Sequence, residues 1–162
     1  MTQTTTLVAP ANTDLGHAKE VIQSTYKQVF GNRHLMELDV NQSLEALFMN
    51  GDLTVQGFVT ALAQSETYRK LFLEPNSPYR FVELNFKHLL GRTPYDQAEL
   101  MSHVRLMNEH GYEAEIASYT YSEEYLRAFG VDQVPFNRST QTISGGRTVN
   151  FSRALAVDAG YA

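Results

Sequence analysis

The residue types that could perform chemistry are present in this chain, but they do not form a familiar catalytic or metal-binding motif. The sequence contains five histidines, none of them in HExxH spacing, and it contains no GxSxG elbow. Gly145-Gly146 is not followed by the Lys-Ser/Thr of a phosphate-binding loop. Glu109, Glu113 and Glu115 could offer paired carboxylates, but they flank a predicted helix end at Gly111, and we expect them to form a solvated face. The sequence therefore predicts a protein that is not an enzyme.

The amino-acid composition excludes several further classes of protein. The chain has 162 residues, of which 43% are hydrophobic and 19% charged, as expected for one globular domain with a hydrophobic core. The absence of cysteine excludes disulfides, thiolate nucleophiles and prosthetic groups attached through a thioether. A net charge of −5 argues against nucleic-acid binding, which needs a basic stripe. No apolar run approaches the length of about 20 residues that a transmembrane helix requires.

The elements that would position any functional side chains are predicted to be helices. Apolar residues recur at three- and four-residue spacing from about Thr13 to Phe129. Capping residues mark the helix starts at Thr54, Ser65 and Ser77-Pro78, and Gly91 marks a helix end. We therefore expect an all-α fold, a compact multi-helix domain. The expected division is a disordered N-terminal arm over residues 1–13, a helical domain over 14–137 and a basic, extended tail over 138–162.

The helical region contains two similar halves. The segment Tyr26-Lys27-Gln28-Val29-Phe30-Gly31 lines up with Phe86-Lys87-His88-Leu89-Leu90-Gly91. Further on, Ser65-Glu66-Thr67-Tyr68 lines up with Ser122-Glu123-Glu124-Tyr125. The pattern is that of two degenerate helical units that bury their apolar faces against each other. Ordinary helix start and stop signals would give a similar match, and the sequence does not separate the two explanations.

The predicted helix between Tyr79 and Arg92 has more polar, directional groups than a core helix needs. At 3.6 residues per turn, one face carries Val82, Phe86, Leu89 and Leu90 and should be core, whereas Leu84 and Lys87 fall on other faces. Arg80 either forms a surface ion pair with Glu83 or belongs to a docking face. The docking alternative comprises Tyr79, Arg80, Asn85 and Arg92.

The tail leaves a similar choice. From Gly130 the chain is rich in Gly, Ser, Thr and Val, and it has no acidic residue between Asp132 and Asp158. Its aromatic side chains either fold back over the helices or bind another protein, and its arginines favour the second alternative because they would attract an acidic partner. These tail residues are Phe136, Arg138, Arg147, Phe151 and Arg153.

Taken together, these residues resemble a known family. The segments NSPYRFVELNFKHLLGRTPYDQAE, GYEAEIASY and SEEY, together with the earlier YKQVFGN and NGDLTVQGFVTALAQSETYRKLF, resemble the linker domain of phycobilisome linker polypeptides over about residues 15 to 137. The tail segment TQTISGGRTVNFSRAL is similar to the one that follows this domain in rod linkers. The resemblance therefore favours a rod linker.

The resemblance implies a helical domain that lies in the central cavity of a phycobiliprotein hexamer, joins discs into rods and tunes bilin energy transfer. It implies a place in the phycobilisome, on the cytoplasmic or stromal face of the thylakoid membrane, with other linkers as further partners. It implies no cofactor in the chain itself, because bilins attach through cysteine and belong to the partner subunits. The expected partner-binding residues are Tyr79, Arg80, Asn85, Arg92, Tyr95, Phe136, Arg138, Arg147, Phe151 and Arg153.

One feature departs from the family pattern. Rod linkers are commonly basic, whereas this chain carries −5, so charge complementarity with a partner would have to be local. The alternative is a general helical interaction adaptor with no relation to pigments.

Overall fold

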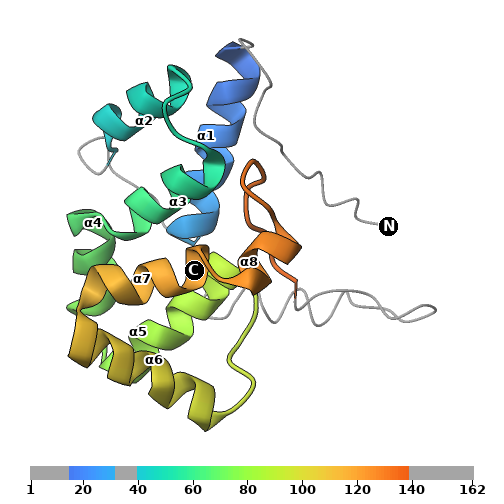
Figure 1. Ribbon diagram of the computed structural model, residues 1–162. Coiled ribbons are helices and arrows are strands. Elements are labelled where there is room, and N and C mark those ends of the chain that lie inside the picture. The colour runs from blue at the N-terminus through green and yellow to red at the C-terminus, as the bar shows by residue number, and fades with distance from the viewer. Residues whose placement is uncertain (1–14, 32–39, 139–162) are drawn as a thin grey trace, which may run out of the picture.

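The computed structural model describes residues 15–31 and 40–138. The regular elements of these residues are helical, which confirms the predicted all-α fold (Figure 1). The elements are α1 (Leu15–Val29), α2 (Gln42–Met49), α3 (Val55–Ala63), α4 (Glu66–Tyr68), the π-helical turn η2 (Arg69–Leu73), α5 (Pro78–Asn85), the π-helical turn η3 (Phe86–Leu90), α6 (Gln97–His110), α7 (Tyr112–Thr120) and α8 (Glu123–Ala128). The predicted arm over 1–13 and the tail beyond 138 lie outside the described residues.

The helices begin where the sequence places capping residues. The side chains of Thr54, Ser65, Ser77 and Ser122 each accept a hydrogen bond from the backbone N–H three residues on, at the starts of α3, α4, α5 and α8. Each cap satisfies one of the N–H groups that a helix start leaves without a partner. The cap of α6 is Asp96, whose side chain accepts a hydrogen bond from the Glu99 N–H.

The described residues divide into two units, each with four α-helices and one π-helical turn. The first runs from α1 to η2 and the second from α5 to α8, and matching elements pack on each other: α1 against η3, and α3 against α7. In Figure 1, α1, α2 and α3 lie above α5 and α6. The Thr60 hydroxyl donates to the Thr120 hydroxyl at 2.8 Å, and the Gln28 amide donates to the His88 carbonyl at 3.0 Å. The arrangement supports the predicted two-unit organisation.

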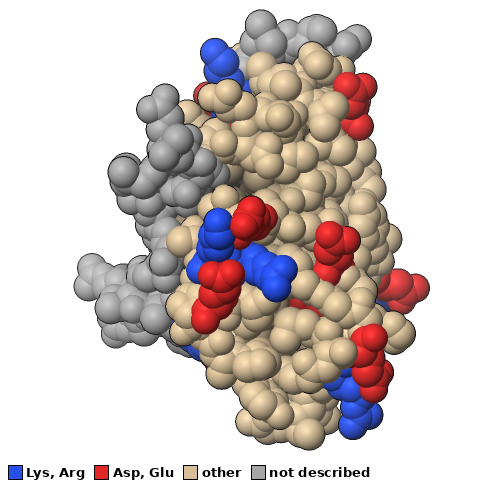
Figure 2. All heavy atoms as spheres, turned by 90° about the vertical axis from the view of Figure 1, so that its left-hand side faces the viewer, with Lys and Arg blue, Asp and Glu red and all other residues tan. Residues whose placement is uncertain are grey.

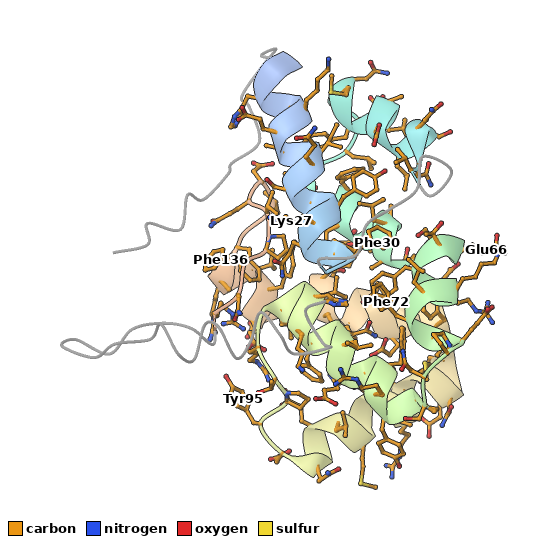
Figure 3. The ribbon with its side chains drawn as sticks, turned by 180° about the vertical axis from the view of Figure 1, so that it is seen from behind. Lys27, Phe30, Glu66, Phe72, Tyr95 and Phe136 are labelled. Atoms are coloured by element: carbon orange, nitrogen blue, oxygen red, sulfur yellow. The ribbon has the colours of Figure 1, made fainter. Side chains whose placement is uncertain are left out.

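Aromatic rings fill the space between the two units. Phe30 at the end of α1 contacts Tyr68 and Phe72 of the first unit, with ring centres 5.8 and 6.4 Å away, and Figure 3 labels Phe30 and Phe72 in this region. Tyr68 in turn packs edge-on against Phe81 of α5 at 6.2 Å. Because large aromatic rings bury much apolar surface, these contacts join the two units into one core.

The central helix α5–η3 is buried on more sides than its sequence suggests. The predicted core positions Val82, Phe86 and Leu89 are completely buried. However, Leu84 and Lys87, which the helical period places on other faces, are also buried, with exposed fractions of 3% and 1%. The period identifies one apolar face, but α1, α6 and α7 all pack against this helix and cover the rest of its circumference.

Candidate protein-interaction surface

The exposed end of α5 carries two of the predicted docking residues. Tyr79 is 48% exposed. Arg80 Nη1 lies 3.1 Å from Glu83 Oε2, and the Arg80 side chain is 29% exposed. The ion pair of the first alternative is therefore present. An ion pair this open to solvent contributes little to stability, and it leaves both side chains at the surface.

Asn85 does not belong to this surface, and its predicted place on a docking face is wrong. The residue is completely buried. Its amide nitrogen donates to Glu115 Oε2 at 2.9 Å, and its oxygen accepts a hydrogen bond from the Tyr68 hydroxyl at 2.7 Å. Asn85 is buried because α6 and η2 pack against α5. Asn85 therefore joins helices of the two units in the interior.

Glu115 corrects a second expectation. The sequence predicts a solvated position for Glu115 beside Glu113, but its exposed fraction is 0%. Burial raises the pKa of the Glu115 carboxyl because the charged form loses its hydration, although the neighbouring His103 opposes the shift. His103 Nδ1 lies 3.6 Å from Glu115 Oε1, and the His103 ring stacks on Tyr119 with centres 4.4 Å apart. These groups form a buried polar cluster with Asn85.

Arg92 is also less accessible than predicted. Its side chain is 8% exposed, and it donates to two carboxylates. The Nε and Nη2 atoms reach Glu124 at 2.5 and 2.8 Å, while Nη2 and Nη1 reach Glu99 at 2.6 and 3.2 Å. Two bidentate pairs of this kind fix the guanidinium in position. Arg92 is therefore a structural residue of the domain, and it does not present a free cation to a partner.

The two carboxylates are strongly acidic as a result. Hydrogen bonds from Arg92 and Arg138 lower the pKa of Glu124 to about 2, although partial burial opposes the shift. Partial burial also works against ionisation of Glu99, but hydrogen bonds from Arg92 and from the Tyr95 N–H lower its pKa overall. Both groups therefore remain charged at neutral pH, and the cluster of Arg92, Glu99, Glu124 and Arg138 balances its charges internally.

Tyr95 lies directly on this cluster. Its side chain is 78% exposed, more than that of any other large hydrophobic residue described. The Arg92 guanidinium carbon lies 3.9 Å from the centre of the Tyr95 ring, within the range of a cation–π contact. Figure 3 shows Tyr95 at the edge of the domain. The structure therefore combines an exposed aromatic side chain with a rigid support.

The start of the predicted tail is attached to the domain. Phe136 is partly buried against Phe129, with ring centres 5.0 Å apart. The Arg138 backbone N–H donates to the Gly91 carbonyl at 2.7 Å, and its side chain bonds Leu90 and Glu124. Phe136 and Arg138 thus fold back over the helices, the first of the two alternatives. The other tail candidates, Arg147, Phe151 and Arg153, lie outside the described residues.

A separate groove lies between α4–η2 and the junction of α6 with α7. It has a volume of about 570 Å³. Arg69 lies over the Tyr112 ring at 6.0 Å, and Lys70 pairs with Glu66 at 3.1 Å. Figure 2 shows this side of the molecule, where basic and acidic side chains lie next to each other and do not separate into patches of one sign. The lining residues are Gln64, Glu66, Arg69, Glu74, His110, Gly111, Tyr112 and Glu113.

Sequence reasoning missed the partners that hold these residues in place. Glu99 and Glu124 each lie in the first turn of a helix, where an acidic residue has an ordinary role next to the N-terminal dipole. Nothing in their spacing from Arg92 indicates a shared guanidinium. Within residues 15–31 and 40–138, no group of three or more His, Asp or Glu side chains is arranged to hold a metal ion. None of the helices described there is long and apolar enough to cross a membrane.

The described residues thus form a helical bundle in which Arg92 and Arg138 are paired internally and Tyr79 and Tyr95 are exposed. The chain belongs to the phycobilisome linker polypeptide family, whose family model matches residues 13–138. This match agrees with the family indicated by the sequence segments around Tyr79 to Glu99.

The chain is also similar to several curated linker polypeptides. It is 46% identical over 155 residues to the 37.5 kDa phycocyanin-associated rod linker polypeptide of Microchaete diplosiphon, covering 94% of this chain and 58% of the relative. It is 48% identical over 142 residues to the 32.1 kDa phycocyanin-associated rod 2 linker of Synechocystis, covering 88% and 52%. A 34.5 kDa phycoerythrocyanin-associated rod linker of Mastigocladus laminosus is 47% identical over 142 residues, covering 88% and 51%. The chain thus spans about half the length of the curated relatives it matches.

Proposed function

We propose that this chain is a non-catalytic linker of phycobilisome rods that binds phycobiliprotein hexamers in their central cavity. The match of the family model to residues 13–138 carries this proposal, and relatives named as rod linkers at 46–48% identity support it. In this role the chain joins discs into rods and tunes the bilins of its partners, and it carries no cofactor itself. The general-adaptor alternative has no observation in its favour.

The proposed contact residues in the helical domain are its exposed tyrosines. Tyr79 and Tyr95 are exposed aromatic side chains on a rigid bundle, and rigid tyrosines are common anchors at protein interfaces. Arg80 follows Tyr79 in α5 and is proposed as a further contact, since its side chain is 29% exposed and paired with Glu83. Arg92 acts indirectly, because it holds Tyr95. Phe151, Arg147 and Arg153 remain proposed contacts of the tail.

The proposed location follows from the assembly. A linker inside a rod is part of the phycobilisome, attached peripherally to the thylakoid membrane on its cytoplasmic or stromal face through the other components. We propose the division of the chain given above, with a helical domain over 14–137 and a basic tail over 138–162. Arg138 then lies at the junction of the two, since its backbone and side chain bond the domain.

The proposal is tested by mixing the protein with purified phycobiliprotein hexamers of the phycocyanin, phycoerythrin and phycoerythrocyanin classes. We expect faster sedimentation of at least one class and a shift of its bilin emission, because a cavity-bound protein excludes water from the bilins that face the cavity. Unchanged sedimentation together with unchanged emission for all three classes would refute the proposed function.

A further inference from the structure

The chain that follows α8 turns back onto the second unit and is fastened there through Phe136 and Arg138. We call residues 136–138 the strap. The Arg138 backbone N–H donates to the Gly91 carbonyl at 2.7 Å, and its Nε atom donates to the Leu90 carbonyl at 2.8 Å. Leu90 is the last residue of η3, so the Arg138 side chain satisfies one of the carbonyls that a helix end leaves without a partner.

The backbone of the strap packs directly against Gly91. Gly91 has φ +69°, and a Cβ atom at this position would collide with the Phe136 carbonyl oxygen and lie 2.9 Å from the Phe136 carbonyl carbon. Only a residue without a side chain combines the left-handed backbone with so close an approach. The backbone of the domain is therefore shaped to receive the backbone of the strap.

The strap is less deeply buried than the core residues that precede it. Val134, two residues before it, is 7% exposed and belongs to the core, and Phe129 at the end of α8 is 4% exposed. Within the strap, Phe136 is only partly buried, and the Arg138 side chain is 22% exposed. Segments with few buried apolar contacts open locally at a lower free energy than the whole domain unfolds. Val134 would stay in place when the strap opens.

Glu124 is the group that joins the strap to the rest of the charge cluster. Arg138 Nη2 reaches Glu124 Oε1 at 2.6 Å from the strap, and Arg92 Nε reaches the same oxygen at 2.5 Å from the loop after η3. Glu99 of α6 is the other acidic group of the cluster, and it binds Arg92. If Glu124 lost its charge, Arg92 would keep Glu99 as an ionic partner. Arg138 would lose its ionic partner and keep its bonds to two backbone carbonyls and its contact with the Phe129 ring, whose centre lies 5.7 Å from the guanidinium carbon.

We propose that the strap is a conformational device with a docked and a released state, and that its contact with Glu124 sets the balance between them. The device is independent of the partner that the chain binds. In the docked state, the chain beyond residue 138 starts at a fixed point beside Gly91. Release frees three residues and extends the reach of the following chain by about 10 Å. The two states thus differ in the point at which the chain that carries Arg147 and Arg153 is attached to the domain.

Trypsin cleavage after Arg138 tests this device, because trypsin must take the arginine side chain into its own pocket. We expect Glu124→Gln to raise the initial rate of cleavage between Arg138 and Ser139 about tenfold, the effect of losing one charge-assisted hydrogen bond. The helical circular dichroism should stay unchanged. Glu123→Gln is the matched control, since Glu123 makes the same charge change in the same helix turn, but its side chain is 87% exposed and pairs only with Arg127 at 3.4 Å.

Two results would overturn the proposal. One is a cleavage rate that is the same in Glu124→Gln, Glu123→Gln and the unmodified protein. The other is faster cleavage throughout the helices with loss of helicity, which would mean that Glu124 supports the whole fold.

Hydrogen exchange on the unmodified protein provides a test that needs no variant. The Arg138 amide is bonded to Gly91 and the Phe129 amide is bonded to Tyr125 within α8. We expect the Arg138 amide to be protected but to exchange at least about tenfold faster than the Phe129 amide. Equal exchange of the two amides would mean that the strap opens only with the domain, and it would refute the released state.

Discussion

The guanidinium of Arg92 lies against the face of the Tyr95 ring, with its central carbon 3.9 Å from the ring centre. The same guanidinium is held by Glu99 and Glu124, so the ring rests on a group that cannot move freely. An exposed side chain normally loses rotamer freedom when it binds a partner, at a cost of about 0.5–1.5 kcal/mol. Tyr95 has lost part of that freedom already, which makes it the strongest candidate for a binding anchor in the described residues.

Tyr95→Ala should therefore weaken binding to phycobiliprotein hexamers much more than it affects the fold. We expect an increase in Kd of about 5- to 30-fold, equivalent to about 1–2 kcal/mol, as for other interface tyrosines. The free energy of unfolding should fall by less than about 1 kcal/mol, because the Tyr95 side chain is exposed and its removal costs the domain only a cation–π contact. Titration by sedimentation and thermal melting measure the two quantities.

A matched control for this variant is Tyr121→Ala. Tyr121 is also exposed, at 58%, but it does not rest on the Arg92 cluster. An equal loss of affinity in both variants would show that tyrosine exposure alone, without the support of Arg92, accounts for the effect.

Arg92→Lys should destabilise the domain although it keeps the charge. A lysine ammonium is a point charge and cannot form two bidentate pairs, so Glu99 and Glu124 would lose most of their hydrogen bonds. We expect a loss of about 1–3 kcal/mol in the free energy of unfolding, measured by urea denaturation. A midpoint and slope identical to those of the unmodified protein would contradict the structural role given to Arg92.

Leu89→Ala tests the assignment of the core face of η3. Leu89 is completely buried, and truncating a buried leucine costs about 2–5 kcal/mol, depending on how far the site collapses. Thermal or urea unfolding of the variant gives the value directly. If the melting midpoint did not change, the packing of η3 against the other helices would have to be different from that described.

The buried Glu115 carboxyl should make the stability of the domain decrease as the pH rises from acidic values. Burial raises the folded-state pKa of Glu115 above its usual value, so the folded protein holds this proton more tightly than the unfolded chain does. The contribution of Glu115 to stability is therefore greatest below the unfolded pKa of about 4.5 and decreases as pH rises through the folded pKa. Glu115→Gln should remove this decrease. The unfolding free energies of the variant and the unmodified protein, plotted against pH between 4.5 and 7, should have different slopes. Parallel curves would contradict a raised pKa of the Glu115 carboxyl in the folded protein.

Local signals in the sequence were sufficient for the helices. Serine and threonine caps such as Thr54 and Ser77 act on N–H groups three residues away, so they can be recognised without knowledge of the fold. The same holds for the apolar face that includes Val82 and Leu89. The similarity between the two halves was compatible with two units that bury their faces on each other, but the sequence alone did not distinguish this from ordinary helix start and stop signals.

The polar interior could not be predicted in the same way. Asn85 and Glu115 are 30 residues apart in the sequence, and the distance of 2.9 Å between their side chains depends on the packing of α5 and α7. Arg92 and Glu124 are likewise 32 residues apart. A polar residue on a helix is usually exposed, and periodicity alone does not show that other helices surround α5 on several sides. The arginines and the asparagine were therefore assigned to the surface.

The central claim is that the domain occupies the cavity on the axis of a phycobiliprotein hexamer. The most direct test is a titration of hexamers with the protein, followed by analytical ultracentrifugation, which gives the number of chains bound at saturation. A single cavity should accept one chain per hexamer, and the bilin emission should stop changing at the same ratio. Saturation at three or six chains would place the protein on the repeated outer surfaces of the subunits and would contradict the account.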